Sequence, residues 1–226
     1  PIQEIFRKIN KKINLISKDE PKLLEDIGLF KKKIPCSGEL LLGHVRYGTY
    51  GKNSIENVQP LLRQNNWMHR NLILAGNFNL TNVNELFSEL IAYGQHPKER
   101  SDTITIMEKI GHFLDSSVAK IYRTLKSEGY TKSDASPQIA KRFNMKKVLY
   151  KASKNWDGGY VIAGLLGHGD SFVLRDPSGI RPAFYHENDE FLVVASERPV
   201  IKTVFDTPEN SIKVLGPGDG LSLIHI

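Results

Sequence analysis

Apolar residues recur at helical spacing in three parts of the chain. The opening segment repeats them at steps of three and four, which predicts an amphipathic helix over Ile2, Ile5, Phe6, Ile9 and Ile13. Residues 82–93 predict a short helix, with Asn82 and Glu85 as a capping box and Gly94 at its C-terminal stop. A longer helix is expected to begin at Ser101 or Asp102. Its apolar stripe is Ile104, Met107, Ile110, Leu114, Val118, Ile121 and Leu125.

Short apolar runs predict strands before and after these helices. ELLLGHV after Pro35 and NLILAGN at 71–77 each predict a buried strand. After Gly158-Gly159, the runs YVIAGLLG, DSFVLRDP, AFYHEND and EFLVVASE lie so close together that antiparallel pairing is favoured. Strands, then helices, then a meander of strands predict a layered α+β fold. The polar, basic stretch 127–153 is expected to be helical in part, and the pattern assigns it no function.

The composition is that of an ordinary globular protein. The 226 residues are 40 % hydrophobic and 25 % charged, enough for one large domain or two small ones. No apolar run approaches the ~20 residues of a membrane span, so no membrane partner is expected. The single cysteine, Cys36, argues against a disulfide framework and favours a cytoplasmic location. The seven histidines form no HxH or HExxH pattern, so no metal site is expected.

The net charge of +6 raises the question of a nucleic-acid partner. Residues 1–33 hold nine Lys/Arg and five Asp/Glu, so +4 of the total lies there. Summed as a whole, the later chain is nearly balanced, and no basic stripe interleaved with aromatic residues stands out. The distribution therefore favours a solvated basic face, and no nucleic-acid partner is expected.

Polar residues gather at the ends of predicted strands in three stretches. In GHVRYGTYGKN, the Arg46 guanidinium can bind a carboxylate, and the Thr49 hydroxyl can add a hydrogen bond. In LAGNFNLTN, Asn77 offers a side-chain amide beside an exposed backbone N–H, as in an oxyanion hole. In RSDT, Asp102 can accept hydrogen bonds from an ammonium group. Alone, each residue is more often an ion pair, a turn residue or a helix cap; together they predict a site for acyl transfer on a free α-amino acid.

Five motifs in order resemble those of class II glutamine amidotransferases: GHVRYGTYG…NVQP, LAGNFNLTN, SDT, RDPSGIRP and VVASERP. These enzymes are N-terminal-nucleophile (Ntn) hydrolases that release ammonia from glutamine. The resemblance covers roughly Glu39 to Gly220 and is closest to the glutaminase domain of the amidophosphoribosyltransferase family of purine biosynthesis. It implies an Ntn-hydrolase fold, a four-layer αββα sandwich with mainly antiparallel sheets.

The resemblance also implies roles for particular residues. Arg46 and Thr49 would hold the α-carboxylate end of glutamine, and Asp102 would bind its α-amino group. The Asn77 side chain and the Phe78 backbone N–H would form the oxyanion hole. A glutamine-binding site is therefore expected where the three polar stretches meet.

The asparagine-rich stretch departs from the family pattern. The family usually reads HNGN where this chain has Gly76-Asn77-Phe78-Asn79. Phe78 keeps a backbone N–H, but a glycine position often needs a positive φ, which a bulky residue resists. Asn79 is expected to brace the loop between Asn77 and the structural Asn82.

The chain ends also depart from the family. The family's nucleophile is an N-terminal cysteine, whereas this chain begins at Pro1, and Cys36 in IPCSGELLL is expected to be a small packing residue. The last residues, LSLIHI, match the translation of a transposase mosaic-end sequencing adapter, although an ordinary final strand is the alternative. The expectation is a fragment: a glutaminase domain over 1–220, truncated at both ends and inactive alone, with an adapter-derived tail at 221–226.

For the full enzyme, the resemblance implies glutamine as substrate and a phosphoribosyltransferase domain on the same chain. That domain would use the ammonia and phosphoribosyl pyrophosphate to make 5-phosphoribosylamine, with Mg²⁺, in a homo-oligomer. No cofactor is expected in the glutaminase domain itself. Three alternatives stay open: another class II synthase of asparagine or glucosamine-phosphate type, a non-catalytic glutamine-binding module, or a structural protein whose polar loops are only turns.

Overall fold

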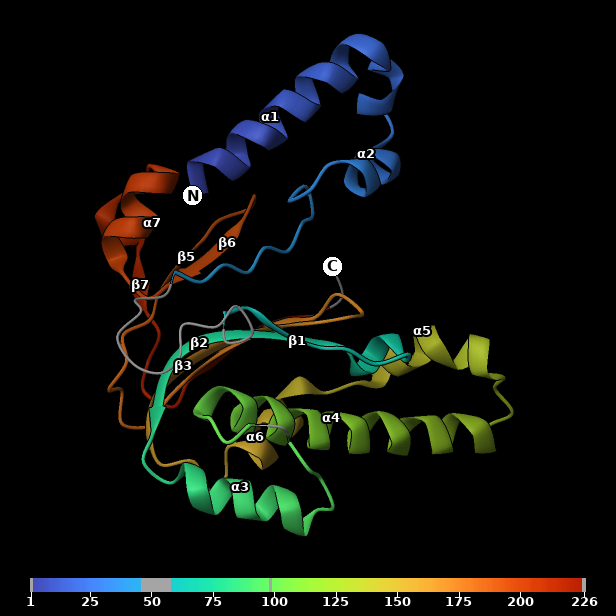
Figure 1. Cartoon of the computed structure of the whole chain (residues 1–226), viewed down its shortest axis with the longest axis vertical. Coiled ribbons are helices and arrows are strands. Elements are labelled where there is room, and N and C mark those ends of the chain that lie inside the picture. Colours follow the sequence, from blue (N-terminus) through green and yellow to red (C-terminus); the bar gives the residue numbers. More distant parts are fainter. Residues whose placement is uncertain (1, 46–57, 98, 225–226) are drawn as a thin grey trace. The chain divides into compact units, whose positions relative to one another are not determined.

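The computed structural model describes residues 2–45, 58–97 and 99–224 (Figure 1). The chain divides into two compact units, Pro1–Leu41 and Leu42–Ile226, so the boundary nearly coincides with the start of the family resemblance. The first unit contains α1 (Ile2–Asp19), the 3-10 helix η1 (Pro21–Leu24) and α2 (Ile27–Lys33). Helix α1 confirms the amphipathic opening helix. Asp26 caps α2, because its Oδ1 accepts a hydrogen bond from the Leu29 N–H at 2.9 Å.

The second unit is built on two antiparallel sheets. The five-stranded sheet has the order β1-β2-β3-β4-β8, and the three-stranded sheet has the order β6-β5-β7. The strands are β1 (Leu61–Arg63), β2 (Leu72–Leu80), β3 (Gly158–Leu166), β4 (Ser171–Arg175), β5 (Phe184–Glu187), β6 (Leu192–Ala195), β7 (Lys213–Val214) and β8 (Gly220–Leu223). The four runs after Gly158 are therefore strands with antiparallel neighbours, as expected.

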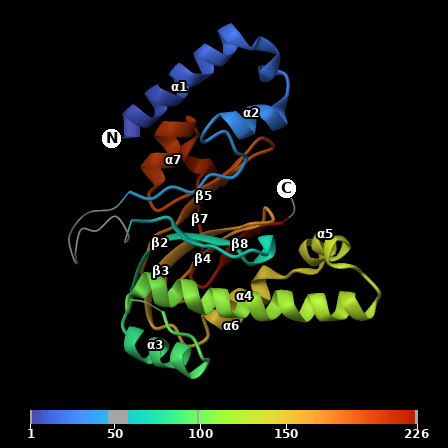
Figure 2. The ribbon, with the colours of Figure 1, turned by 45° about the vertical axis from the view of Figure 1, so that its right-hand side comes forward.

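Helices cover the outer faces of the two sheets within this unit. Figures 1 and 2 show α3 to α6 on one side of the five-stranded sheet, with the three-stranded sheet and α7 on the other. The helices are η3 (Met68–Arg70), α3 (Val83–Ala92), α4 (Asp102–Ser127), α5 (Lys132–Arg142), α6 (Met145–Ala152), α7 (Arg198–Phe205) and η4 (Glu209–Ser211). This arrangement confirms the α+β fold and its αββα layers. None of the helices in the described residues combines the length and apolarity needed to cross a membrane.

The main core lies between α4 and the five-stranded sheet. Helix α4 buries Ile110, Leu114, Val118 and Leu125 completely, which confirms the predicted apolar stripe. Gly111 faces β1, where a β carbon would collide with the Arg63 side chain. Arg63 uses that space to bind Asp115 at 2.7 Å and Glu108 at 3.2 Å. A helix-weakening glycine is therefore explained by an ion pair that joins β1 to α4.

The stretch 127–153 is part of this core. Helices α5 and α6 both pack on α4, and the segment buries Ala135, Ile139, Phe143, Val148 and Ala152. The expectation of partial helix is confirmed. The basic appearance of the stretch comes from its exposed positions, while its apolar positions complete the core.

Several local expectations were wrong. The described part of ELLLGHV forms no strand, because an apolar run becomes a strand only where a partner accepts its hydrogen bonds. Asn82 does precede α3, but its side chain makes no capping bond; its Nδ2 donates to the Asn155 carbonyl and its Oδ1 accepts from the Asp157 N–H. Cys36 is exposed and has a φ of 59°, so it is not a packing residue. Residues 221–223 of LSLIHI lie in β8 and pair with β4. The adapter origin of residues 221–226 stays a prediction.

Candidate active site

The candidate site follows one edge of β2. Strand β1 pairs with β2 only over Leu72 to Leu74, whereas β3 pairs with it from Leu72 to Leu80. Past Leu74, one edge of β2 therefore has no neighbouring strand among the described residues. Because successive residues of a strand direct their N–H groups to opposite sides, alternate residues from 76 to 80 share this edge.

Two side chains accept hydrogen bonds from the N–H groups of Gly76 and Leu80, which flank that of Phe78 on this edge. Gln59 Oε1 accepts the Gly76 N–H at 2.7 Å, and Asp102 Oδ2 accepts the Leu80 N–H at 2.9 Å. The Phe78 N–H points to the same edge by the alternation of the strand. It lies between two fixed acceptors and has no partner among the described residues. This is the backbone donor that the resemblance assigns to the oxyanion hole.

Asn77 lies on the opposite face of β2 from the helical core. Leu72, Leu74 and Leu80 are buried, while Asn77 and Asn79 are exposed. The Asn77 amide makes no hydrogen bond within the described residues, so its N–H groups are available to a ligand. Strand β2 runs unbroken to Leu80, so the expected loop between Asn77 and Asn82 does not exist, and Asn79 braces no such loop.

Phe78 fits this strand without backbone strain. The only non-glycine residues with positive φ in the described chain are Cys36 and Asp206. The concern that Phe78 occupies a glycine-only conformation is therefore answered, since extended backbone suits an aromatic residue.

Asp102 joins the start of α4 to the end of β2. It is the first residue of the helix, after the N-cap Ser101, whose Oγ accepts the Ile104 N–H at 3.3 Å. One carboxylate oxygen of Asp102 holds the Leu80 N–H, which leaves the other oxygen open to a cation. The structure thus brings Asp102 next to the segment that carries Asn77 and Phe78. Arg46 and Thr49 lie outside the described residues.

Gln59 is the site residue that sequence reasoning missed. It is the third residue of NVQP, one of the stretches that carry the family resemblance. That motif was the sequence signal that could have pointed to Gln59. By accepting the Gly76 N–H, Gln59 fixes the strand edge two residues before the Phe78 donor. We interpret it as a positioning residue.

The RDPSGIRP motif supports β3 behind this edge. The fully buried Asp176 accepts hydrogen bonds from the N–H groups of Ile180 and Arg181 at 2.8 and 3.1 Å, and of Tyr160 at 3.3 Å. Burial acts to raise the pKa of Asp176, but these three N–H groups and the charge of Arg175 outweigh it, so the pKa is lowered.

Arg175 and Tyr160 complete this support. The Arg175 guanidinium donates to the carbonyls of Arg181, Gly179 and Leu215. Burial, with the Asp176 charge, raises the pKa of Tyr160 to about 12, so its phenol stays neutral. Tyr160 is the β3 partner of Phe78. Arg175 and Asp176 therefore serve the fold and support the strand against which β2 is aligned.

No group of three or more His, Cys, Asp or Glu side chains able to hold a metal ion occurs in the part of the chain that the structure describes. The polar groups along β2 are N–H groups and amides, which can donate hydrogen bonds, and the Asp102 carboxylate, which accepts them. Such a set suits hydrogen bonding to a carbonyl oxygen and an ammonium group.

Comparison with known proteins adds independent support. No family model matches the chain. An amidophosphoribosyltransferase from Bacillus subtilis is 33 % identical over 165 residues, which is 71 % of this chain and 28 % of that enzyme. The enzyme of Methanothermobacter thermautotrophicus is 30 % identical over 161 residues, with the same two shares. The chain is thus similar to one part of the amidophosphoribosyltransferases.

Solved structures agree. The Bacillus subtilis glutamine phosphoribosylpyrophosphate amidotransferase in complex with ADP and GMP matches with a TM-score of 0.54 and 25 % identity, over 80 % of this chain and 32 % of that one. A structure described as the allosteric regulatory enzyme of purine biosynthesis matches equally well, at 26 % identity. The chain spans less than a third of the length of the first curated relatives, so the likeness concerns that part of those enzymes.

Proposed function

We propose that this chain is the glutaminase part of an amidophosphoribosyltransferase. The observation that carries the proposal is the open Phe78 N–H on the edge of β2, between the acceptors Gln59 and Asp102. The side-chain carbonyl of glutamine would bind this N–H and the Asn77 amide. Its α-amino group would bind the open oxygen of Asp102, and Arg46 and Thr49 would hold the carboxylate end.

The proposed reaction is acyl transfer to a cysteine. A thiolate attacks the side-chain amide carbon of glutamine, and the oxygen of the tetrahedral intermediate gains negative charge. Donors already aimed at that oxygen are worth ~3–4 kcal/mol each. Ammonia leaves, and water then hydrolyses the thioester to glutamate. The resemblance assigns attack to an N-terminal cysteine whose own amine is the base, and the internal Cys36 has no free amine.

In the full enzyme, the ammonia would displace pyrophosphate from phosphoribosyl pyrophosphate to give 5-phosphoribosylamine. We place this second step in a phosphoribosyltransferase domain that uses Mg²⁺, in a cytoplasmic homo-oligomer. The names of the relatives favour this acceptor over those of asparagine or glucosamine-phosphate synthases. Full-length protein supplied with glutamine and each acceptor in turn would distinguish the three.

Glutamine binding tests the site directly. Calorimetric titration of the 226-residue chain with L-glutamine is expected to show one binding site. Asn77→Ala is expected to raise the dissociation constant about tenfold, which corresponds to the loss of one hydrogen bond between neutral groups. Asn79→Ala is the matched control, because Asn79 has the same side chain on the same exposed face two residues away. Equal weakening by both variants, or no binding by the parent, would reject the placement.

Ammonia release separates a binding module from an enzyme. The chain as given is expected to bind glutamine without releasing ammonia, and Cys36→Ser is expected to change neither property. Release that survives Cys36→Ser would contradict the proposed thiolate chemistry. Release that depends on Cys36 would make the internal cysteine the nucleophile.

A further inference from the structure

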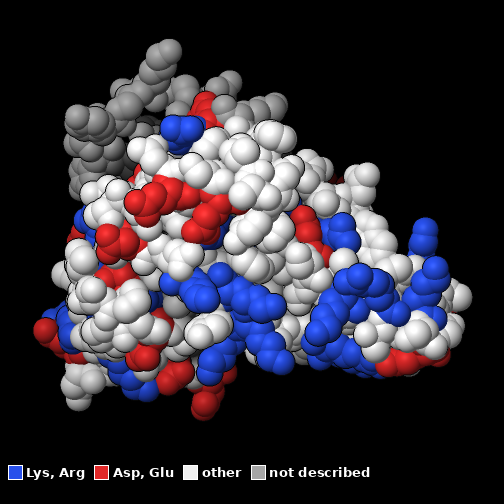
Figure 3. All heavy atoms as spheres, turned by 90° about the horizontal axis from the view of Figure 1, so that it is seen from below, with Lys and Arg blue, Asp and Glu red and all other residues white. Residues whose placement is uncertain are grey.

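A cluster of basic residues lies on the helical side of the second unit (Figure 3). Residues 120–154 hold ten Lys/Arg and only two Asp/Glu. The net charge of this short stretch therefore exceeds the net charge of the entire chain, which is +6. Summing the charge over the whole later chain concealed this cluster, because acidic residues elsewhere offset it. Figure 3 shows Lys and Arg gathered in two groups on the face that looks away from the sheets.

Most of these cations are not neutralised by the protein. Arg142 forms a two-pronged ion pair with Glu128 at 2.8 Å. The other Lys and Arg side chains of residues 120–154 make no ion pair with any described residue, and all are exposed. A surface that keeps so many like charges together is destabilised by their repulsion, which a polyanion would relieve.

Two of these cations, Arg123 and Lys132, line a groove between α4, the start of α5 and η3. Its volume is about 560 Å³. It is lined by Trp67, Arg70, Ser116, Ala119, Tyr122, Arg123 and Lys132. The lining thus combines three cations with two aromatic rings and carries no carboxylate.

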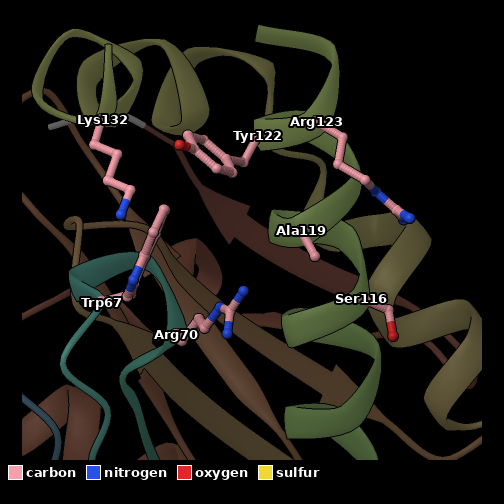
Figure 4. A pocket seen from close by; sticks show the side chains of 7 residues that line it. All are labelled: Trp67, Arg70, Ser116, Ala119, Tyr122, Arg123 and Lys132. Carbon is pink, nitrogen blue, oxygen red and sulfur yellow. The ribbon is translucent and has the colours of Figure 1, made fainter. Parts of the chain in front are cut away.

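The aromatic rings in the groove are held in fixed positions. The Arg70 guanidinium lies over the Trp67 ring, 5.4 Å from its centroid, and Tyr122 meets Trp67 edge-on with centroids 5.1 Å apart. Figure 4 shows Lys132 pointing from α5 toward Trp67, while Arg123 extends away along α4. Asp115 lies 3.9 Å from Arg70 and is mainly engaged by Arg63. Fixed rings beside the exposed cations Arg123 and Lys132 suit a flat base joined to a phosphate.

The positive charge continues beyond the groove along α4. Lys120 and Lys126 each lie three residues from Arg123, one helical turn before and after it. The track is therefore longer than a single nucleotide requires. An extended ligand makes use of the charges along the helix, whereas a mononucleotide reaches only those in the groove.

We propose that this groove and the adjoining basic surface of α4 bind single-stranded nucleic acid, with one base stacked on Trp67 and the backbone phosphates along Lys132, Arg123 and the neighbouring α4 lysines. Aromatic platforms in a positively charged groove are the general means of binding single strands without sequence preference. The proposal reverses the expectation drawn from the summed charge. It uses none of the residues assigned to glutamine.

Fluorescence anisotropy with a labelled ten-nucleotide oligouridylate tests this on the whole 226-residue chain. Micromolar binding that weakens steeply with added salt is expected. Trp67→Ala is expected to weaken binding about tenfold, the usual effect of one lost stacking partner. Arg123→Glu/Lys132→Glu is expected to weaken it by more than tenfold.

Lys202→Glu/Lys213→Glu is the matched control, since it makes the same charge change on α7 and β7 by breaking two exposed ion pairs. It is expected to shift the dissociation constant less than threefold at equal salt. Equal loss in both double variants would show non-specific attraction and overturn the proposal, as would no loss with Trp67→Ala. Competition by UMP or inorganic pyrophosphate at the oligomer's own concentration would assign the groove to a small phosphate ligand instead.

Discussion

The ring of Phe78 packs directly over Gly76, two residues earlier on the same face of β2. A β carbon on residue 76 would lie 2.9 Å from Cδ1 and Cε1 of Phe78, and 2.5 Å from the Val161 carbonyl oxygen on β3. The family's HNGN has a large residue first and glycine third, whereas this chain has glycine first and Phe78 third. The two departures are therefore coupled: the ring that replaces one glycine needs the other.

Gly76→Ala is expected to destabilise the fold by about 1–3 kcal/mol, the usual cost of overpacking, measured by urea unfolding. In a Phe78→Ala background the cost should fall without vanishing, because the Val161 carbonyl stays in place. Gly43→Ala is the control, since a β carbon there meets nothing within 4 Å, and its effect should be below about 0.5 kcal/mol. Equal effects at the two glycines would contradict the packing argument.

Asp102 is expected to separate folding from binding. Asp102→Asn retains an oxygen for the Leu80 N–H but loses the charge that would hold an ammonium group. It should therefore unfold near the parent's urea midpoint and lose glutamine binding. Asp102→Ala should lose both, with about 1–3 kcal/mol of stability lost with the acceptor. A loss of stability in Asp102→Asn as large as in Asp102→Ala would show that the charge serves the fold.

The ion pair between Lys109 and Glu89 predicts unequal effects of its two partners. The Lys109 side chain is only 2 % exposed, while Glu89 is 31 % exposed and also accepts from Asn155. Glu89→Ala leaves the buried Lys109 ammonium without its partner and should lower the free energy of unfolding by about 3–5 kcal/mol. Lys109→Met should cost clearly less, and adding it to Glu89→Ala should recover stability in thermal unfolding. Similar losses in the two single variants would refute this account.

Asp176 predicts a loss of stability in acid. Its pKa in the folded protein lies below the ordinary 3.8, so the unfolded chain takes up a proton first as the pH falls. The stabilisation is complete above about pH 3.8 and is lost as the pH falls through the folded-state pKa. Asp176→Asn should be less stable at neutral pH but should show a flatter dependence of unfolding free energy on pH below 4. An equally steep loss of unfolding free energy below pH 4 in the parent and in Asp176→Asn would contradict this account.

Periodicity predicted the helices because α3 and α4 bury one face and end at local signals. Gly94 takes a φ of 80° after α3, and Gln95 and Gly94 donate to the carbonyls of Leu90 and Ile91, as a glycine stop requires. Information of this kind lies within a few residues of sequence, so a single chain is enough to find it.

The details of the site could not be predicted in this way. Nothing local to Gly76 shows that β2 continues to Leu80, because the continuation depends on β3, which lies about eighty residues later in the chain. The start of β3 is itself shaped by β2: Gly158, at a φ of 127°, has no room for a β carbon beside the Asn79 carbonyl. Gln59 likewise gains its role only when the fold brings its amide to the Gly76 N–H.

The edge of β2 also has a consequence for self-association. A strand edge with several free N–H groups in a row is a template for pairing with another molecule. Gln59 and Asp102 accept the N–H groups of Gly76 and Leu80, so among the described residues this edge offers a second strand one open donor, at Phe78, instead of three. We therefore expect the side chains that frame the proposed oxyanion position to limit pairing with other molecules as well, since their joint loss would leave the N–H groups of Gly76, Phe78 and Leu80 without these acceptors.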